Sequence, residues 1–275
     1  MHETRRTSRE SEPTAPALSV NFDAIKSKPE RNPRLEEFHD IFGSAGQRQR
    51  FFEGARETFR FMFRPDEVHN HLEAAPNKTS FKHLKRARRS GLILKASYNF
   101  FDKTHLTPQP LQDFLKDLGK HNDHYENGDR EKHAKKLAAS RIHDVANLDL
   151  GIEIADDENF RKYLRTEISR ILTLLESPRL PLKQFHELRK KIRIFADSLQ
   201  VAAAEDLGGN LHWLFASLLE LSVSLGEKHD EYVQSAIKGK HAEDIEVEID
   251  PQIKEKFLKL LPYIGRTFGM PAELI

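Results

Sequence analysis

The sequence repeats itself, and this repeat limits the folds open to the chain more than any other feature. Three stretches recur in the same order: Phe81–Arg89 as Phe185–Arg193, Leu118–Tyr125 as Leu225–Tyr232, and Phe51 with Arg56 as Phe160 with Arg165. The copies are offset by 104, 107 and 109 residues, and loops of unequal length in the two copies would account for these small differences. Because three collinear matches are hard to obtain by chance, they predict an internally duplicated fold.

Apolar residues recur at helical spacing in segment after segment from about Gln47 onward, and strand-like alternation is scarce. The expected helices span residues 47–64, 79–101, 108–124, 129–147, 156–176, 182–205, 209–226, 228–241 and 251–268. Thr107 before Pro108 and Asp250 before Pro251 predict helix starts that combine a capping side chain with a proline in the first turn. Only residues 151–154 and 245–249 alternate apolar and acidic side chains as short strands do. The sequence therefore predicts an all-α protein.

The chain divides into an arm and two helical halves. Its first 34 residues hold four prolines, seven basic and five acidic residues, and few apolar ones. Such a composition cannot bury enough apolar surface to offset the entropy of ordering, so we expect residues 1–46 to form a mostly disordered arm. The first helical half then covers 47–150 and the second 151–275. We expect the halves to pack about a pseudo-twofold axis, because equivalent apolar faces are self-complementary.

Composition excludes several classes of protein. The chain of 275 residues carries 44 Lys and Arg against 43 Asp and Glu, a formal charge of +1, so anion binding must come from local clusters of positive charge. The lack of cysteine excludes disulfides and thiolate catalysis. No apolar stretch approaches the roughly 20 residues of a membrane helix, and the start of the chain has no export-like apolar core. We therefore expect a cytoplasmic protein that does not enter the membrane.

Each copy of the repeat contains a helix with a cationic face. In the second copy the basic side chains are spaced i, i+3, i+4, i+7 and so share one side of a helix. They are His186, Arg189, Lys190 and Arg193, and the aligned residues of the first copy are Lys82, Lys85, Arg86 and Arg89. Apolar stripes lie opposite them, formed by Leu188, Ile192, Phe195 and Leu199 in the second copy and by Leu84, Ala87, Gly91, Leu94 and Tyr98 in the first.

Two interpretations of these basic stripes are open. Each stripe could be a solvated face, or could be neutralised by acidic residues elsewhere in this Glu-rich chain. Their recurrence at aligned positions favours the other interpretation, a paired cationic surface that binds a polyanion. Arginine suits such a surface because it offers phosphate oxygens a planar fork of donors, whereas lysine offers a flexible point charge.

The segment Phe185–Arg193, followed by Leu225–Asp230, resembles a CHAD domain, the conserved histidine alpha-helical domain. The resemblance covers about residues 47–268, with a basic helix followed by a Leu-Gly turn and an acid in both halves. It implies a pair of four-helix bundles related by a pseudo-twofold, with a basic central groove that binds inorganic polyphosphate. It implies no catalysis, no cofactor and no metal, and a location in the cytoplasm together with polyphosphate-containing granules.

The resemblance also assigns residues to the groove. Carried over position by position, the polyphosphate-binding candidates are Lys82, Lys85, Arg86, Arg89, His186, Arg189, Lys190 and Arg193, with Arg56 and Arg165 as weaker members.

A metal-dependent phosphohydrolase of the HD class is the enzymatic alternative. It needs an adjacent His-Asp pair, a further His and a distant Asp around one ion that activates water. The chain offers three such pairs, His39-Asp40, His143-Asp144 and His229-Asp230, and further histidines at His69, His71, His121 and His124. Because adjacent His and Asp residues are common by chance, three competing pairs make none of them persuasive.

Other polyanions and a purely structural role complete the alternatives. Nucleic acid could lie against a cationic helix, although no reader motif is present. A helical scaffold could bind a protein partner through the arm or through the acidic stretch Glu243–Asp250. Two features favour packing over function: Trp213 lies among leucines as a core residue would, and Asp123 with Tyr125 suits a helix cap or a packed turn.

Overall fold

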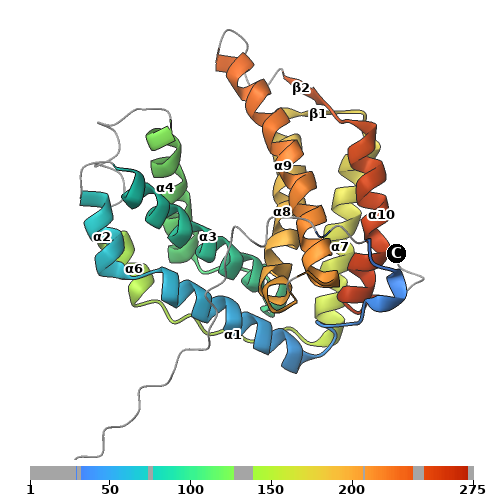
Figure 1. Ribbon diagram of the computed structural model, residues 1–275, viewed down its shortest axis with the longest axis horizontal. Helices are drawn as coiled ribbons and strands as arrows, with labels where there is room; N and C mark the ends of the chain where they lie inside the picture. Colours follow the sequence, from blue (N-terminus) through green and yellow to red (C-terminus); the bar gives the residue numbers. More distant parts are fainter. Residues whose placement is uncertain are drawn as a thin grey trace, which may run out of the picture.

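The computed structural model describes residues 29, 32–73, 77–126, 139–206, 208–237 and 245–271. Within these ranges the protein is almost entirely helical, which confirms the predicted all-α class (Figure 1). Its helices are α1 (Ala45–Met62), α2 (Pro65–Glu73), α3 (Lys78–Phe101), α4 (Gln109–Glu126), α6 (Ala139–Ala146), α7 (Asp157–Glu176), α8 (Leu182–Glu205), α9 (Asn210–Ile237) and α10 (Pro251–Thr267). A short 3-10 helix, η2 (Leu35–Glu37), precedes α1. Strands β1 (Arg179–Pro181) and β2 (Glu246–Glu248) form an antiparallel pair.

The helices pack in two groups. In the first, α3 packs against α1, α2 and α4, while α6 contacts α2 and α4. In the second, α8 packs against α7 and most extensively against α9, which also contacts α10. The groups meet where α3 contacts α8, and α3 and α4 diverge from α8 and α9 on one side of this contact (Figure 1). Internal duplication and the pseudo-twofold axis stay predictions.

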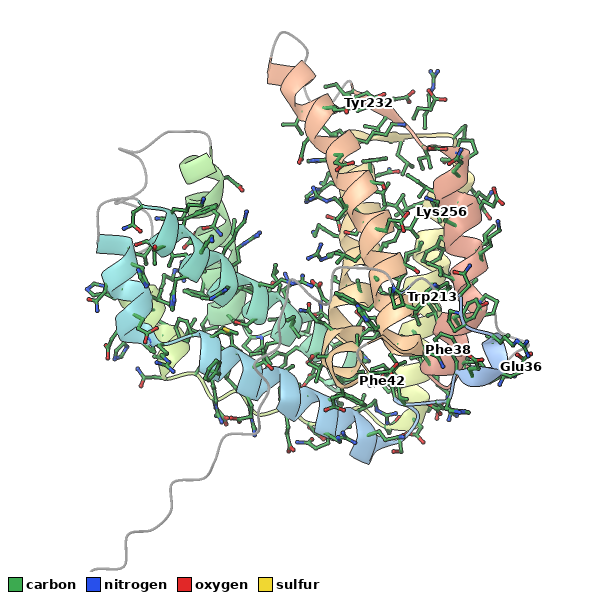
Figure 2. All side chains as sticks on the ribbon, in the orientation of Figure 1. Glu36, Phe38, Phe42, Trp213, Tyr232 and Lys256 are labelled. Carbon is green, nitrogen blue, oxygen red and sulfur yellow. The ribbon has the colours of Figure 1, made fainter. Side chains whose placement is uncertain are left out.

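The apolar stripes predicted for α3 and α8 are buried. Leu188, Ile192 and Leu199 have no exposed surface, and Leu84 is 1% exposed. Trp213 is a core residue, as predicted, and its indole N–H donates to Asn32 Oδ1 at 3.1 Å. Its ring packs near that of Phe38 (Figure 2). The Phe38 ring in turn meets that of Tyr263 edge-on.

The boundary that we set for the arm is wrong at its C-terminal end. Residues 1–28 lie outside the described part of the chain, but Phe38 and Phe42 are completely or almost completely buried. Phe42 packs against the rings of Phe51, Phe101 and Phe268. Two aromatic residues in a short polar segment give no helical period, so the sequence pattern does not reveal that they belong to the core.

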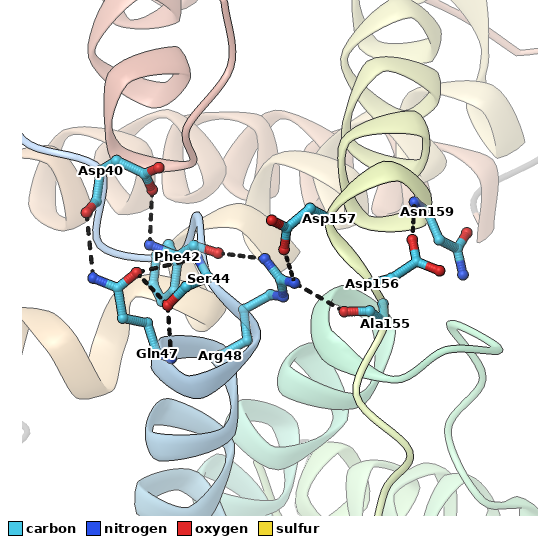
Figure 3. A network of polar contacts seen from close by, with 9 residues as sticks. All are labelled: Asp40, Phe42, Ser44, Gln47, Arg48, Ala155, Asp156, Asp157 and Asn159. Atoms are coloured by element: carbon cyan, nitrogen blue, oxygen red, sulfur yellow. Dashed lines mark hydrogen bonds and ion pairs between the residues drawn. The ribbon is translucent and has the colours of Figure 1, made fainter.

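Arg48 ties the start of α1 to the start of α7. The side chain is fully buried and donates to the Phe42 carbonyl at 2.8 Å, to the Ala155 carbonyl at 2.9 Å and to Asp157 Oδ1 at 2.6 Å (Figure 3). Its guanidinium also lies over the Phe160 ring, 4.5 Å from the ring centroid. These acceptors compensate the buried charge, although Nε is buried without a hydrogen-bond partner, and they fix the relative placement of the two helix starts.

Several predicted elements need correction. Residues 209–226 and 228–241 contribute to one helix, α9, because Gly226 is buried inside it and does not end it. Helix α2 was missed because it is short, with Val68 as its one fully buried apolar residue. Residues 151–154 form no strand, only a single bridge between Ile154 and Asp102. The strand predicted at 245–249 is confirmed as β2, but its partner β1 was missed, since a three-residue strand has no readable alternation.

Two predicted regions are described only in part. Of the helix predicted at 129–147, residues 139–146 are α6, and 129–138 lie outside the described residues. Of the acidic stretch, Glu243 and Asp244 lie outside them as well.

One of the two predicted caps is confirmed. Asp250 accepts the Gln252 N–H at 2.9 Å, with Pro251 at the first position of α10. Thr107 is not the N-cap of α4, because the helix begins at Gln109 and Pro108 directly precedes it; the Thr107 hydroxyl donates to Asn99 Oδ1 at 3.0 Å. Within the described ranges, no helix combines the length and apolar character needed to cross a bilayer.

Candidate anion-binding site

A buried carboxylate stands where α3 meets α8. Asp197 of α8 has a side chain only 3% exposed, and its Oδ1 accepts Arg89 Nη1 from α3 at 2.6 Å and Arg193 Nε at 2.9 Å. Arg89 also donates through Nη2 to Gln200 Oε1. Two arginines from different helices are therefore oriented by one acid.

Two further arginines lie against helix backbones at glycine positions. Arg88 of α3 rests on Gly119 of α4, where an added Cβ would be 3.0 Å from Arg88 Nη2. Arg189 of α8 rests on Gly226 of α9, where an added Cβ would be 2.9 Å from Arg189 Cζ. A side chain at either glycine would occupy the space of the guanidinium. Each glycine therefore leaves room for an arginine side chain to lie against the helix backbone.

Arg88, Arg89, Arg189 and Arg193 form what we call the arginine cluster. Burial lowers the pKa of Arg89 to about 10, with Asp197 opposing the shift and Arg193 and Arg88 adding to it. Burial likewise lowers the pKa of Arg88, and the positive charges of Arg193 and Arg189 lower it further. Because neighbouring arginines contribute to both shifts, the guanidinium groups of the cluster are close enough to repel one another. A bound anion would relieve this repulsion.

Three acids offset part of this charge. Asp197 is the buried one, whereas Asp230 lies 3.8 Å from Arg189 with a side chain 64% exposed. Asp123, also exposed, raises the pKa of Arg88. Because solvent screens exposed charges, Asp123 and Asp230 compensate the arginines weakly and could be outcompeted by a multivalent anion.

The basic side chains continue along α8. Lys190 pairs with Glu187 at 2.9 Å on the same helix. Across the helix contact, burial lowers the pKa of Lys95 in α3, Lys190 lowers it further, and Glu187 opposes the shift. The cationic surface therefore extends from the arginine cluster over the face that α3 and α8 share.

The other predicted residues are distributed around this cluster. Lys82, Lys85 and Arg86 are exposed on the N-terminal part of α3, before its contact with α8. Lys85 Nζ lies 4.9 Å from the centroid of the Phe81 ring. Arg56 of α1 is half-buried, 3.5 Å from Glu57. Arg165 of α7 lines a different hollow, which also includes Lys191. The structure thus gathers Arg89, Arg189 and Arg193, and it separates Arg165 from them.

His186 faces a second histidine. Its ring centroid is 4.9 Å from that of His229 in α9, and its Nδ1 is buried without a hydrogen-bond partner. His229 Nδ1 in turn lies 3.0 Å from Asp230 Oδ1, the same oxygen that faces Arg189. Burial lowers the pKa of His186, and the neighbouring His229 and Lys190 lower it further.

Sequence reasoning missed three contributors and misplaced one motif. Arg88, Asp197 and Gln200 were not assigned to the site, although an acid inside the apolar run that follows Arg193 is a signal for a buried ion pair. The predicted Leu-Gly turn is wrong, because Gly119 and Gly226 lie inside α4 and α9. Asp123 and Tyr125 likewise belong to helix α4, not to a cap or turn.

The alignment within α3 also needs a shift. Residue matching paired Arg189 with Lys85, but the side chain that contacts a glycine of the neighbouring helix, as Arg189 does, is Arg88. The glycines and the acids need no such shift: Gly119 still aligns with Gly226, and Asp123 with Asp230.

The His-Asp pairs differ in their surroundings. Asp40 Oδ1 accepts the Phe42 N–H at 3.1 Å, and His143 and Asp144 are both exposed on α6. Among the described residues, no group of three or more His, Cys, Asp or Glu side chains is placed to hold a metal ion.

Comparison with known proteins adds no relative. The chain matches no protein-family model, no curated protein and no solved structure.

Proposed function

We propose that the protein binds inorganic polyphosphate, without hydrolysing it, at the arginine cluster and the adjoining basic face of α3 and α8. The observation that carries the proposal is the gathering of four guanidinium groups from two helices, of which only Arg89 and Arg193 are bound to the buried carboxylate of Asp197. The cluster has more guanidinium N–H donors than Asp197 can accept. The remaining donors suit phosphate oxygens, which accept paired hydrogen bonds from arginine.

The resemblance to a CHAD domain supports the same ligand. Of the residues that it assigns, Arg89 and Arg193 share Asp197, while Arg189 lies beside Asp230. Lys82, Lys85 and Arg86 would extend the binding surface along α3. A long chain of phosphates can contact many such side chains, each of which contributes little on a wet surface, so affinity would come from their number.

Calorimetric titration with long-chain polyphosphate tests the proposal. We expect saturable binding that weakens steeply with salt, because each neutralised phosphate releases counterions. Arg189→Gln should weaken binding about tenfold, since its guanidinium is not tied to Asp197 and its loss leaves that ion pair intact. Lys256→Gln is the matched control: Lys256 is an exposed cation on α10, paired with Glu220 at 3.2 Å (Figure 2).

The same titration separates the alternatives. Binding to double-stranded DNA or RNA as tight as to polyphosphate would favour a nucleic-acid protein, and release of inorganic phosphate on addition of Mg²⁺ or Mn²⁺ would favour the phosphohydrolase. If no polyanion bound at low salt, the proposal would be wrong, and the arginine cluster would be explained by its acids alone.

A further inference from the structure

A second cationic hollow lies on the opposite side of α8 from the arginine cluster. It has a volume of about 550 Å³ and is formed by α7 together with Lys191. Lys191 is two residues from both Arg189 and Arg193, which turns its side chain about 200° around the helix from theirs. The hollow is therefore separate from the site proposed for polyphosphate.

A buried acid organises this hollow, as Asp197 organises the arginine cluster. Glu167 has a side chain 10% exposed, and it holds one cation with each oxygen: Arg170 Nη1 at 2.6 Å from Oε1 and Lys191 Nζ at 2.6 Å from Oε2. Three cations line the hollow, Arg165, Arg170 and Lys191, and Glu167 binds two of them, so these four side chains together carry a net charge of +2.

Several donors in the hollow remain available. Arg165 is exposed and makes no ion pair with the described part of the chain. The hydroxyls of Ser169 and Thr173 follow at i+4 and i+8 on the same face of α7, and neither is hydrogen-bonded to a described residue. The Thr166 hydroxyl is occupied, because it donates to the Lys162 carbonyl at 2.9 Å.

We propose that this hollow, formed by Arg165, Ser169, Arg170, Thr173 and Lys191, is a second anion site that binds a phosphomonoester. A phosphomonoester carries a charge of about −1.5 to −2 at neutral pH, which matches the local charge of the hollow. Arg165 supplies a planar fork of N–H donors and the two hydroxyls supply neutral donors, while Glu167 keeps Arg170 and Lys191 in place. The site does not depend on whether the arginine cluster binds polyphosphate.

An NMR titration of the full chain with inorganic phosphate and, separately, with phosphoserine tests the site at constant ionic strength maintained with chloride. We expect saturable shifts of the α7 amides with both probes. Arg165→Gln should weaken phosphoserine binding about tenfold, because a charged hydrogen bond is lost, and Thr173→Val should weaken it severalfold. Lys162→Gln is the matched control: it removes an exposed lysine of α7 that does not line the hollow, and binding should not change.

Three results would overturn the proposal: no saturable shift with either probe, equal binding by Arg165→Gln and the wild type, or shifts confined to residues around Asp197. In Arg189→Gln the α7 shifts should persist, even though polyphosphate binding weakens in that variant. Loss of the α7 shifts there would mean that phosphate acts through the arginine cluster, which also contradicts a second site.

Discussion

The guanidinium of Arg189 lies so close to Gly226 that a Cβ on this glycine would be 2.9 Å from Arg189 Cζ. Arg88 and Gly119 stand in the same relationship in the other helix group, with 3.0 Å between the added Cβ and Arg88 Nη2. Both glycines are helical, where glycine costs about 1 kcal/mol relative to alanine. The arginines therefore explain why two helix interiors keep a residue that weakens them.

Replacing Gly226 with alanine should therefore weaken polyphosphate binding while changing the stability of the fold little. The methyl group would push the flexible end of Arg189 aside while improving the helix, so we expect Gly226→Ala to change the melting temperature by no more than a few degrees. Polyphosphate affinity should fall about threefold to tenfold, because Arg189 leaves its position. Calorimetry and thermal unfolding measure the two effects.

Gly46→Ala is the control for this substitution. Gly46 also lies in a helix, α1, and an added Cβ there would meet no atom within 4 Å. Unchanged polyphosphate binding in Gly226→Ala would show that the position of the Arg189 guanidinium against Gly226 has no part in the site.

Arg48 should be among the most costly polar side chains to remove. Arg48→Ala leaves the carbonyls of Phe42 and Ala155 without their donor and deprives Asp157 of its partner. We expect a loss of about 2–3 kcal/mol in the free energy of unfolding, below the range for breaking a fully buried ion pair, because the Asp157 side chain is 50% exposed. Urea unfolding measures it, with Arg50→Ala as the control. Arg50 pairs with Glu205 at the surface, so its removal should cost less than about 1 kcal/mol.

The sequence predicts the helices of this protein better than the contacts between them. Along α3 and α8 the apolar residues that recur at helical spacing are the ones that are buried, because a long amphipathic helix repeats this pattern over many turns. The aromatic contacts of Phe38 and Phe42 could not be predicted, since they depend on distant residues such as Phe268 and Tyr263. Helix α2 and strand β1 are too short to show a period.

The candidate site was predictable in its residue types but not in its geometry. A stripe of positive charge can be read from i, i+3, i+4, i+7 spacing, which identified Arg89 and Arg193 as members of polar faces. Their shared acid, Asp197, belongs to a run of buried residues and becomes a partner only once α3 crosses α8. Arg88 is found only through its contact with Gly119.

Removing Asp197 should increase the response to anions. Asp197→Asn leaves Arg89 and Arg193 without a counter-charge, and we expect a loss of about 2–3 kcal/mol in the free energy of unfolding. This is below the usual cost of breaking a fully buried pair, because the two arginine side chains remain 19% and 33% exposed. If the arginine cluster binds polyphosphate, the ligand should raise the melting temperature of Asp197→Asn more than that of the wild type. An equal rise in both proteins would argue against binding beside Asp197.

Mild acid should destabilise the protein through His186. Burial lowers its pKa in the folded state, so the unfolded chain, in which histidine titrates near pH 6.5, binds the proton more readily. The contribution of neutral His186 to stability is therefore complete above about pH 6.5, falls as the pH drops below that value, and levels off once folded His186 is also protonated. His186→Gln should flatten the stability profile between pH 6.5 and 5, measured by urea unfolding in steps of half a pH unit. His143→Gln, at an exposed histidine of α6, should leave the profile unchanged. Equal slopes for the wild type and His186→Gln would show that the acid sensitivity arises elsewhere, with His83 the next residue to test, because burial and His71 lower its pKa too.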